Sequence, residues 1–107
     1  MPHSKSIEYQ SNLQVVAGIA RALLHPARLL ILSQLRNSPA TLVQLAEDHP
    51  ISIPNLNNHL RYLINIELVQ CDRSRRQAIY STSQEKWPTT VKILVNSTSE
   101  TSIKLAS

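Results

Sequence analysis

The chain has 107 residues and a formal net charge of +4, from eleven lysines and arginines against seven aspartates and glutamates. This length has room for one domain and one hydrophobic core, over residues 1–107, and is too short for a multidomain enzyme. The single glycine excludes phosphate-binding glycine loops and most turn-rich β architectures, since both need residues that adopt positive φ readily. We therefore expect a mainly α-helical domain, with flexible tails at 1–5 and 98–107.

Cysteine content and hydropathy bear on the compartment. The lone cysteine, Cys71, cannot form an intramolecular disulfide, which excludes a disulfide-stapled secreted scaffold and favours a reducing environment. The longest purely apolar run, Leu29–Leu32, is far shorter than the roughly 20 residues that span a bilayer. The N-terminal residues also lack the apolar core of a signal peptide. We expect a cytoplasmic protein with no membrane partner. Its net positive charge favours a polyanionic partner.

Apolar residues at three- and four-residue spacing predict two helices in the first third of the chain. The first begins after Ser6 and carries its apolar residues over Leu13–Leu24. Its Gly18 is either simply tolerated or marks the close approach of another helix. The second covers Pro26–Arg36, because proline loses no hydrogen bond at a first helical position. It is apolar on nearly every face, so we expect it at the centre of the domain.

Two further helices follow, separated by a short break at residues 49–51. The earlier one covers Leu42–Asp48 and opens with a capping box, in which the side chains of Thr41 and Gln44 satisfy free backbone amides. The later one follows an N-cap at Ser52 and ends at about residue 66. It keeps an apolar stripe on one side, whereas its other side has polar residues that are mediocre helix formers on an exposed surface. These polar residues are Asn55, Asn57, Asn58 and Arg61.

The next segment alternates polar and apolar residues, which predicts a β-hairpin. Its strands are Leu68–Cys71 and Gln77–Ser81, and Asp72–Arg76 forms a basic tip. Cys71 is interpreted as a half-buried packing residue, with an oxidant-sensing thiol as the alternative. A resolving cysteine for such a thiol would have to come from another chain.

A last helix opens at Pro88 and carries Val91, Leu94 and Val95 on one side. Two helices joined by a short turn, the second with an amide-rich outer face, and then a hairpin tipped with arginines describe a winged helix-turn-helix. The predicted fold class is therefore mainly α with a small β-hairpin: five helices plus a two-stranded wing.

The residue types on this face suit double-stranded DNA. Asparagine pairs bidentately with adenine and arginine with guanine, and a helix has the right width for the major groove. Arginines on a projecting hairpin can reach phosphates or the neighbouring minor groove. We expect major-groove contacts from Ile53, Asn55, Asn57, Asn58 and Arg61, and backbone or minor-groove contacts from Arg28, Arg73, Arg75 and Arg76.

The chain resembles the ArsR family of bacterial winged-helix transcriptional regulators over about Ala20–Thr82. Ala22–Leu32 is similar to the family's ALADPTRLRIL, and Leu45–Leu63 to its LAEALGLSQPTVSHHLKVL. Leu68–Tyr80 resembles its GLV…RREGRWVYY. The resemblance implies a homodimer that binds an inverted-repeat operator, usually as a repressor relieved by an effector. The first and last helices would form the dimer, and we expect its interface at Leu13, Val16, Ala20, Val91, Leu94 and Val95.

Several positions depart from the family pattern. Pro50 and Arg75 stand where the family has glycines in the turn and the wing tip, so both turns must use negative φ. His25 replaces an aspartate and is a poorer helix cap. Thr41–Val43 replace the Cys-Val-Cys of metal-sensing members, and no His or Asp follows Ser83. We therefore expect no regulatory metal site and no cofactor, so that any effector is an unidentified small molecule or redox signal.

Other functions remain as alternatives. No glycine elbow surrounds any serine, so we do not expect an enzyme. His59 is either a hydrogen-bonded structural residue or a DNA-facing one. The main alternative to DNA binding is a winged-helix module that binds a protein and leaves its basic wing solvated. RNA binding is less favoured, because the exposed aromatic residues that stack unpaired bases are nearly absent.

Overall fold

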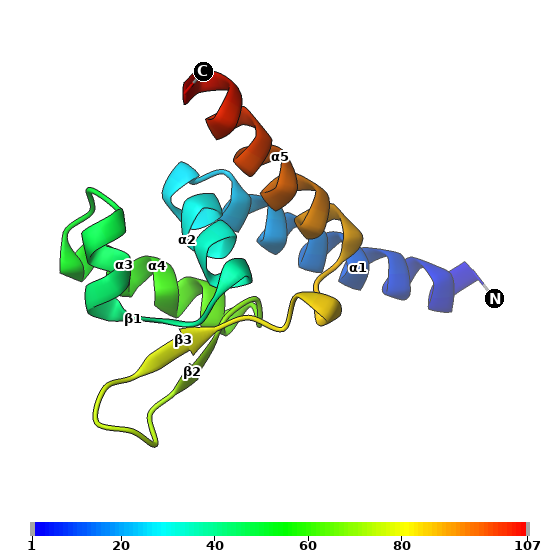
Figure 1. Cartoon of the computed structure of the whole chain (residues 1–107). Coiled ribbons are helices and arrows are strands. Elements are labelled where there is room, and N and C mark those ends of the chain that lie inside the picture. The colour runs from blue at the N-terminus through cyan, green and yellow to red at the C-terminus, as the bar shows by residue number, and fades with distance from the viewer. Residues whose placement is uncertain (1, 107) are drawn as a thin grey trace.

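The computed structural model describes the backbone of residues 2–106 and the side chains of residues 13–97. It contains five α-helices, one short 3₁₀ helix and three β-strands (Figure 1). The predicted mainly α fold is therefore confirmed. In chain order the elements are α1 (Pro2–Leu23), α2 (Pro26–Asn37), β1 (Ala40–Thr41), α3 (Leu42–Asp48), α4 (Ile53–Asn65), β2 (Gln70–Asp72), β3 (Ile79–Ser81), η1 (Gln84–Lys86) and α5 (Thr89–Ala106).

Helix α2 lies at the centre of the domain, as its all-round apolar character predicts. It packs against α1, α4 and α5, and its Ile31 and Leu32 are fully buried. The apolar stripe of α4, formed by Leu56, Leu60 and Leu63, closes the same core from the other side. Burial of this stripe fixes which face of α4 is left for solvent.

The sheet has three antiparallel strands in the order β1-β3-β2, where the sequence predicts only a two-stranded wing. Ala40 of β1 pairs with Tyr80 of β3, and Cys71 of β2 pairs with the same Tyr80 from the other side. β1 has two residues and directly follows Pro39, so it shows no alternation of its own. Its strand conformation comes from pairing with β3, which a local pattern cannot reveal.

The predicted caps of α3 and α4 are present. The Thr41 hydroxyl accepts a hydrogen bond from the backbone N–H of Gln44 at 3.3 Å, and the Thr41 N–H donates to Gln44 Oε1 at 2.9 Å. The Ser52 hydroxyl accepts from the N–H of Asn55 at 3.4 Å. His25 precedes α2 without a side-chain capping bond, as expected. These caps set where the two helices of the helix-turn-helix begin.

Glu67 ends α4 in a left-handed conformation, with φ of 65°. Its N–H donates to the carbonyl of Ile64, and the Leu68 N–H donates to that of Leu63, which together form a Schellman motif. No other non-glycine residue of the described backbone has positive φ. The turns at Pro50 and Arg75 therefore use negative φ, as the sequence predicts.

Trp87 joins the region of α4 and the wing to the last helix. Its ring is buried, and its Nε1–H donates to the carbonyl oxygen of Leu68 at 3.1 Å. Leu68 follows the end of α4, whereas Trp87 lies between η1 and α5. The single tryptophan therefore holds the start of α5 against the joint between α4 and the wing.

Both terminal helices are longer than predicted. α1 begins at Pro2 rather than after Ser6, which fits the preference of proline for the first helical turn. α5 continues to Ala106. The expected flexible tails, 1–5 and 98–107, fall on residues whose side chains lie outside the described part of the chain, and that expectation stays a prediction.

Among the described residues, no single helix is long and apolar enough to cross a membrane. Only Leu13–Leu23 and α2 taken together reach the required length and hydropathy, and these two segments are bent by 93° relative to each other.

Candidate nucleic-acid interface

The amide-bearing side of α4 faces solvent. With about 3.6 residues per turn, Asn58 and Arg61 lie roughly opposite the buried leucine stripe, and both are exposed. Ile53 and Asn55, in the first turn, are exposed as well. Asn57 differs from its neighbours, because it is half-buried on the flank that turns toward the wing. Four of the five residues predicted for the major groove therefore share an open surface, and the fifth lies at its edge.

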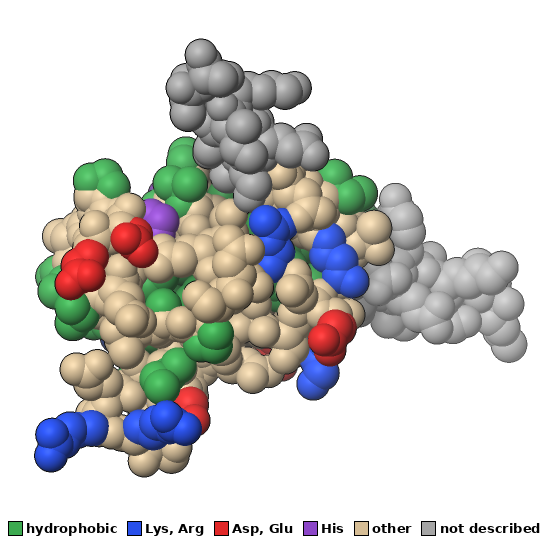
Figure 2. Space-filling model, viewed as in Figure 1, with side chains coloured by type: hydrophobic (Ala, Val, Ile, Leu, Met, Phe, Trp, Pro, Cys, Tyr) green, Lys and Arg blue, Asp and Glu red, His purple; other side chains and the backbone are tan. Residues whose placement is uncertain are grey.

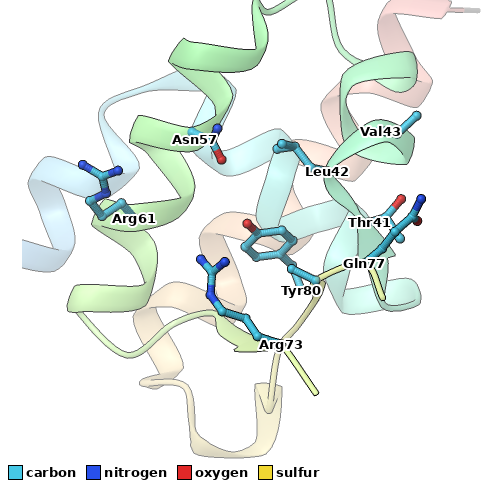
Figure 3. Close-up of a pocket in the computed structure, with 9 residues that line it drawn as sticks. Thr41, Leu42, Val43, Asn57, Arg61, Arg73, Gln77 and Tyr80 are labelled. Carbon is cyan, nitrogen blue, oxygen red and sulfur yellow. The ribbon is translucent and has the colours of Figure 1, made fainter. Parts of the chain in front are cut away.

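A groove separates α4 from the wing (Figure 3). One cavity in it has a volume of about 470 Å³, and an adjoining cavity has about 370 Å³. Both cavities contact Asn57, Arg61, Arg73 and Tyr80. In Figure 3 the guanidinium of Arg73 lies beside the Tyr80 ring, whereas Arg61 extends outward from α4. The groove thus has a wall from the helix, a wall from the hairpin and an aromatic floor.

The wing tip is basic and exposed. Arg73, Arg75 and Arg76 are all exposed, and Figure 2 shows basic side chains clustered on the projecting hairpin. The carboxylate of Asp72 accepts a hydrogen bond from the backbone N–H of Ser74 at 2.9 Å, which shapes the tip without a glycine. The hydroxyl and amide of Ser74 lower the pKa of Asp72, and Arg75 lowers it further. The arginines predicted for the wing are therefore presented together.

Arg28, predicted to contact the DNA backbone, is half-buried and makes two contacts within the chain. Its Nε–H donates to Nδ1 of His59 at 3.1 Å, and its guanidinium carbon lies 3.9 Å from the centre of the Tyr62 ring. Tyr62 in turn donates a hydrogen bond to the carbonyl of Gly18 at 3.4 Å. Arg28 therefore links α2 to the flank of α4 away from the wing.

His59 has a structural environment. Its ring centre lies 5.3 Å from that of His25, and its Nδ1 accepts the hydrogen bond from Arg28. Burial lowers the pKa of His59, and the positive charges of Arg28 and His25 lower it further. A neutral, accepting imidazole supports the structural interpretation of His59 over the DNA-facing one.

His49 is a polar core residue that the sequence does not single out. It is 9% exposed, and its Nε2 lies 2.7 Å from Oε1 of Gln34. The amide nitrogen of Gln34 donates to the Asp48 carboxylate at 2.8 Å, so α2 holds the C-terminal end of α3. Burial lowers the pKa of His49, and the neighbouring Asp48 opposes this effect. A histidine in a predicted break gives no pattern that marks it as buried.

Gly18 of α1 is a tolerated helical glycine rather than a point of close packing. A Cβ built at this position meets no atom within 4 Å. Of the two interpretations left open by the sequence, simple tolerance is therefore the one that fits the packing within this chain.

The residues predicted for a dimer interface divide into two groups. Leu13, Val16 and Leu94 are 49%, 58% and 40% exposed, and Ala20 is exposed too. Val91 and Val95 are fully buried in the chain's own core, because their side of α5 packs on α2. Between α1 and α5 lies an apolar cavity of about 100 Å³, with Val16, Ala20 and Leu94 among its lining. Val15 and Ile93, which the prediction omits, are also exposed.

The described residues contain no group of three or more His, Cys, Asp or Glu side chains that could hold a metal ion. Thr41–Val43 line the groove between α4 and the wing. Cys71 is half-buried opposite Tyr80. Burial raises the pKa of Tyr80, Cys71 adds to this rise, and Arg73 opposes it.

Residues 25–70 match the family described as bacterial regulatory protein, arsR family. The HTH-type transcriptional regulator NmtR of Mycobacterium tuberculosis is 40% identical over 78 residues. That match covers 73% of this chain and 64% of the relative, so the chain spans slightly less than two thirds of that protein's length. The family is described as one of regulatory proteins and the relative as a transcriptional regulator, a non-enzymatic class, in agreement with the expectation that the chain is not an enzyme.

Two solved structures share the fold. NolR from Sinorhizobium fredii is 29% identical with a TM-score of 0.71, covering 87% of this chain and 89% of that one. The transcriptional repressor BigR from Xylella fastidiosa is 26% identical with a TM-score of 0.66, covering 88% and 87%.

Proposed function

Because the chain belongs to the ArsR family of winged-helix regulators, we propose that it binds double-stranded DNA and regulates transcription. The observation that carries this function is one continuous surface, on which the exposed amide face of α4 adjoins the basic wing across an open groove. Asparagine and arginine side chains on a solvent-facing helix match the hydrogen-bonding pattern of base edges in the major groove. The bacterial cytoplasm, where the chromosome lies, is the compartment that this activity requires.

The contacts follow from where the side chains lie. α4 enters the major groove with Ile53, Asn55, Asn58 and Arg61 toward the base edges. Arg75 and Arg76 reach the neighbouring minor groove or its phosphates from the wing tip. We propose a backbone contact for Arg28 as well, since its hydrogen bond to His59 uses only Nε–H of the guanidinium donors.

A homodimer gives the domain its operator geometry. The exposed apolar residues of α1 and α5, Leu13, Val16, Ala20 and Leu94, form a face that a second copy would bury. A twofold axis through this face places two α4 helices in successive major grooves, about 34 Å apart. The operator is then an inverted repeat with half-sites about 10 bp apart. Repression is the regulatory outcome we propose, in line with the structural relative BigR, described as a repressor.

A fluorescence titration with random-sequence duplex DNA at low salt tests DNA binding directly. A DNA-binding dimer shows salt-dependent affinity for any duplex, because neutralised phosphates release counterions. Absence of measurable affinity at low salt contradicts the proposal and favours the protein-interaction module. Selection from genomic fragments then identifies the operator and shows whether it is an inverted repeat.

A further inference from the structure

The groove between α4 and the wing has a place in the proposed DNA complex. When a helix occupies the major groove and a hairpin reaches the next minor groove, one sugar-phosphate strand separates the two elements. That strand must pass through whatever space lies between helix and hairpin. In this chain the space is the groove of two adjoining cavities, of about 470 Å³ and 370 Å³.

The groove is lined by hydrogen-bond donors from both walls. Asn57 projects from the α4 wall, Arg73 from the wing, and Tyr80 from the floor, and these three line both cavities. Thr41 and Gln77 add a hydroxyl and an amide to the larger one. No aspartate or glutamate lines either cavity in the described part of the chain. The lining therefore offers two positive charges, Arg61 and Arg73, and several further donors, with no aspartate or glutamate among its described residues.

Arg73 has different surroundings from the arginines at the wing tip. Asp72 interacts electrostatically with Arg75, whereas the guanidinium of Arg73 lies beside the Tyr80 ring (Figure 3). Arg61 also lines both cavities, and its side chain extends outward from α4 (Figure 3). Two arginines therefore line the groove, Arg73 beside its aromatic floor and Arg61 on the α4 wall, whereas Arg75 and Arg76 line neither cavity.

We propose that the groove holds the DNA strand that separates the major and minor grooves, and that Arg73 and Asn57 bind its phosphate backbone. This assignment rests on the proposed DNA-binding function. It divides the DNA contacts into those that fix the position of the protein and those that recognise bases. Asn57 is predicted from the sequence to recognise a base. In this assignment it binds phosphate instead and fixes the position of the protein on the DNA. Base recognition falls to the open side of α4, chiefly Asn58 and Arg61, and the minor groove to the wing tip.

The test compares four variants on two duplexes, the sequence recovered by selection and a random sequence. Asn57→Ala weakens binding to both duplexes by the same factor, about three- to tenfold for one hydrogen bond to phosphate. Asn58→Ala weakens binding to the selected duplex alone. Arg73→Gln lowers the slope of log K against log salt by about 0.9 for each bound subunit, which is about 1.8 for the dimer. Lys86→Gln removes one charge from η1, which lines neither cavity, and leaves the slope unchanged.

Each contrary result has a distinct meaning. If the wild type binds duplex but Asn57→Ala loses affinity only for the selected sequence, Asn57 recognises a base and the strand assignment is overturned. An unchanged salt slope in Arg73→Gln overturns it as well. Failure of the wild type to bind any duplex overturns the proposed function and this inference together. Circular dichroism of every variant verifies folding, since Arg73 and Asn57 contribute no core side chain.

A free phosphate ion is the alternative ligand for the groove, because it has the same charged oxygens as the DNA backbone. Thermal unfolding of the wild type and Arg73→Gln, in phosphate and in chloride at equal ionic strength, separates the two. A phosphate-induced rise in midpoint that Arg73→Gln abolishes, together with an unchanged DNA salt slope, assigns the groove to a small anion and overturns the strand assignment. An unfolding midpoint that phosphate does not change, together with a reduced salt slope in Arg73→Gln, supports the strand assignment.

Discussion

At the scale of single residues, Glu67 has a backbone conformation that is unfavourable for any residue other than glycine. It adopts φ of 65° at the end of α4, where the resemblance aligns the glycine of the family's GLV. A side chain with a Cβ pays a steric cost in this conformation that glycine avoids. The local pattern gives no warning of it, since a helix can also end without a left-handed residue.

Glu67→Gly is expected to stabilise the protein by about 1 kcal/mol, because glycine relieves the left-handed strain. Denaturant unfolding of both proteins measures the difference. Glu67→Ala serves as the control: it removes the same charge but keeps the Cβ, so its free energy of unfolding should stay near that of the wild type. A similar gain from both substitutions would assign the effect to charge instead of conformation.

Stability should fall in mild acid because of His49 and His59. The folded-state pKa of each lies below the ordinary value of 6.5, chiefly through burial. The unfolded chain therefore binds protons more readily than the folded one, and the free energy of unfolding is complete above pH 6.5. It declines as pH falls through the folded-state pKa values.

A series of denaturant titrations across this pH range measures the decline. His49→Gln keeps a side-chain donor for Gln34 Oε1 but no longer titrates, so its curve should be flatter than that of the wild type. A decline of equal steepness in His49→Gln and the wild type would show that other groups cause it.

At the scale of elements, the sequence predicts those parts that have a local signature. The capping box at Thr41 and the N-cap at Ser52 place α3 and α4 correctly, because capping depends on neighbours in the chain. The sequence does not predict β1, because its two residues form a strand only by pairing with β3, which is distant in the chain. The site divides in the same way. Exposure of Asn58 follows from helical periodicity, whereas the inward placement of Asn57 depends on where the wing packs.

The wing tip provides a prediction at this scale. Replacing both Arg75 and Arg76 by glutamine should lower the salt slope of duplex binding by up to about 1.8 for each subunit, about 3.6 for the dimer, if each arginine neutralises one phosphate. Titrations at several salt concentrations give the slope. A double variant that retains the wild-type slope would place the tip outside the interface, even if affinity changed for another reason.

At the scale of the whole molecule, the predicted dimer determines the operator geometry. Its six predicted residues fall into exposed and buried sets, because both sides of α5 are apolar near its start and the sequence does not show which side meets α2. Val91 and Val95 face the core, which leaves Leu13, Val16, Ala20 and Leu94 as the dimer surface that we propose.

Val16→Glu and Leu94→Glu should each convert the dimer to a monomer, since an unpaired carboxylate in an apolar interface is costly. Native mass spectrometry gives the oligomeric state, and duplex affinity should fall in parallel. Val43→Glu puts the same charge on an exposed apolar position of α3 and should remain dimeric, and it is a control for oligomeric state alone because Val43 also lines the groove beside α4. Dimers in all three variants would move the interface away from the α1 and α5 surface.

The placement of Trp87 gives the molecule a built-in optical reporter. The chain has one tryptophan, and its indole hydrogen-bonds the joint between the recognition helix and the wing while sitting at the start of the proposed dimerisation helix. Any signal that passes between the subunit contact and the DNA-reading surface must either move this ring or pass around it. Its emission wavelength and quenching can therefore follow operator binding, or the arrival of an effector, without a label and in the unmodified protein.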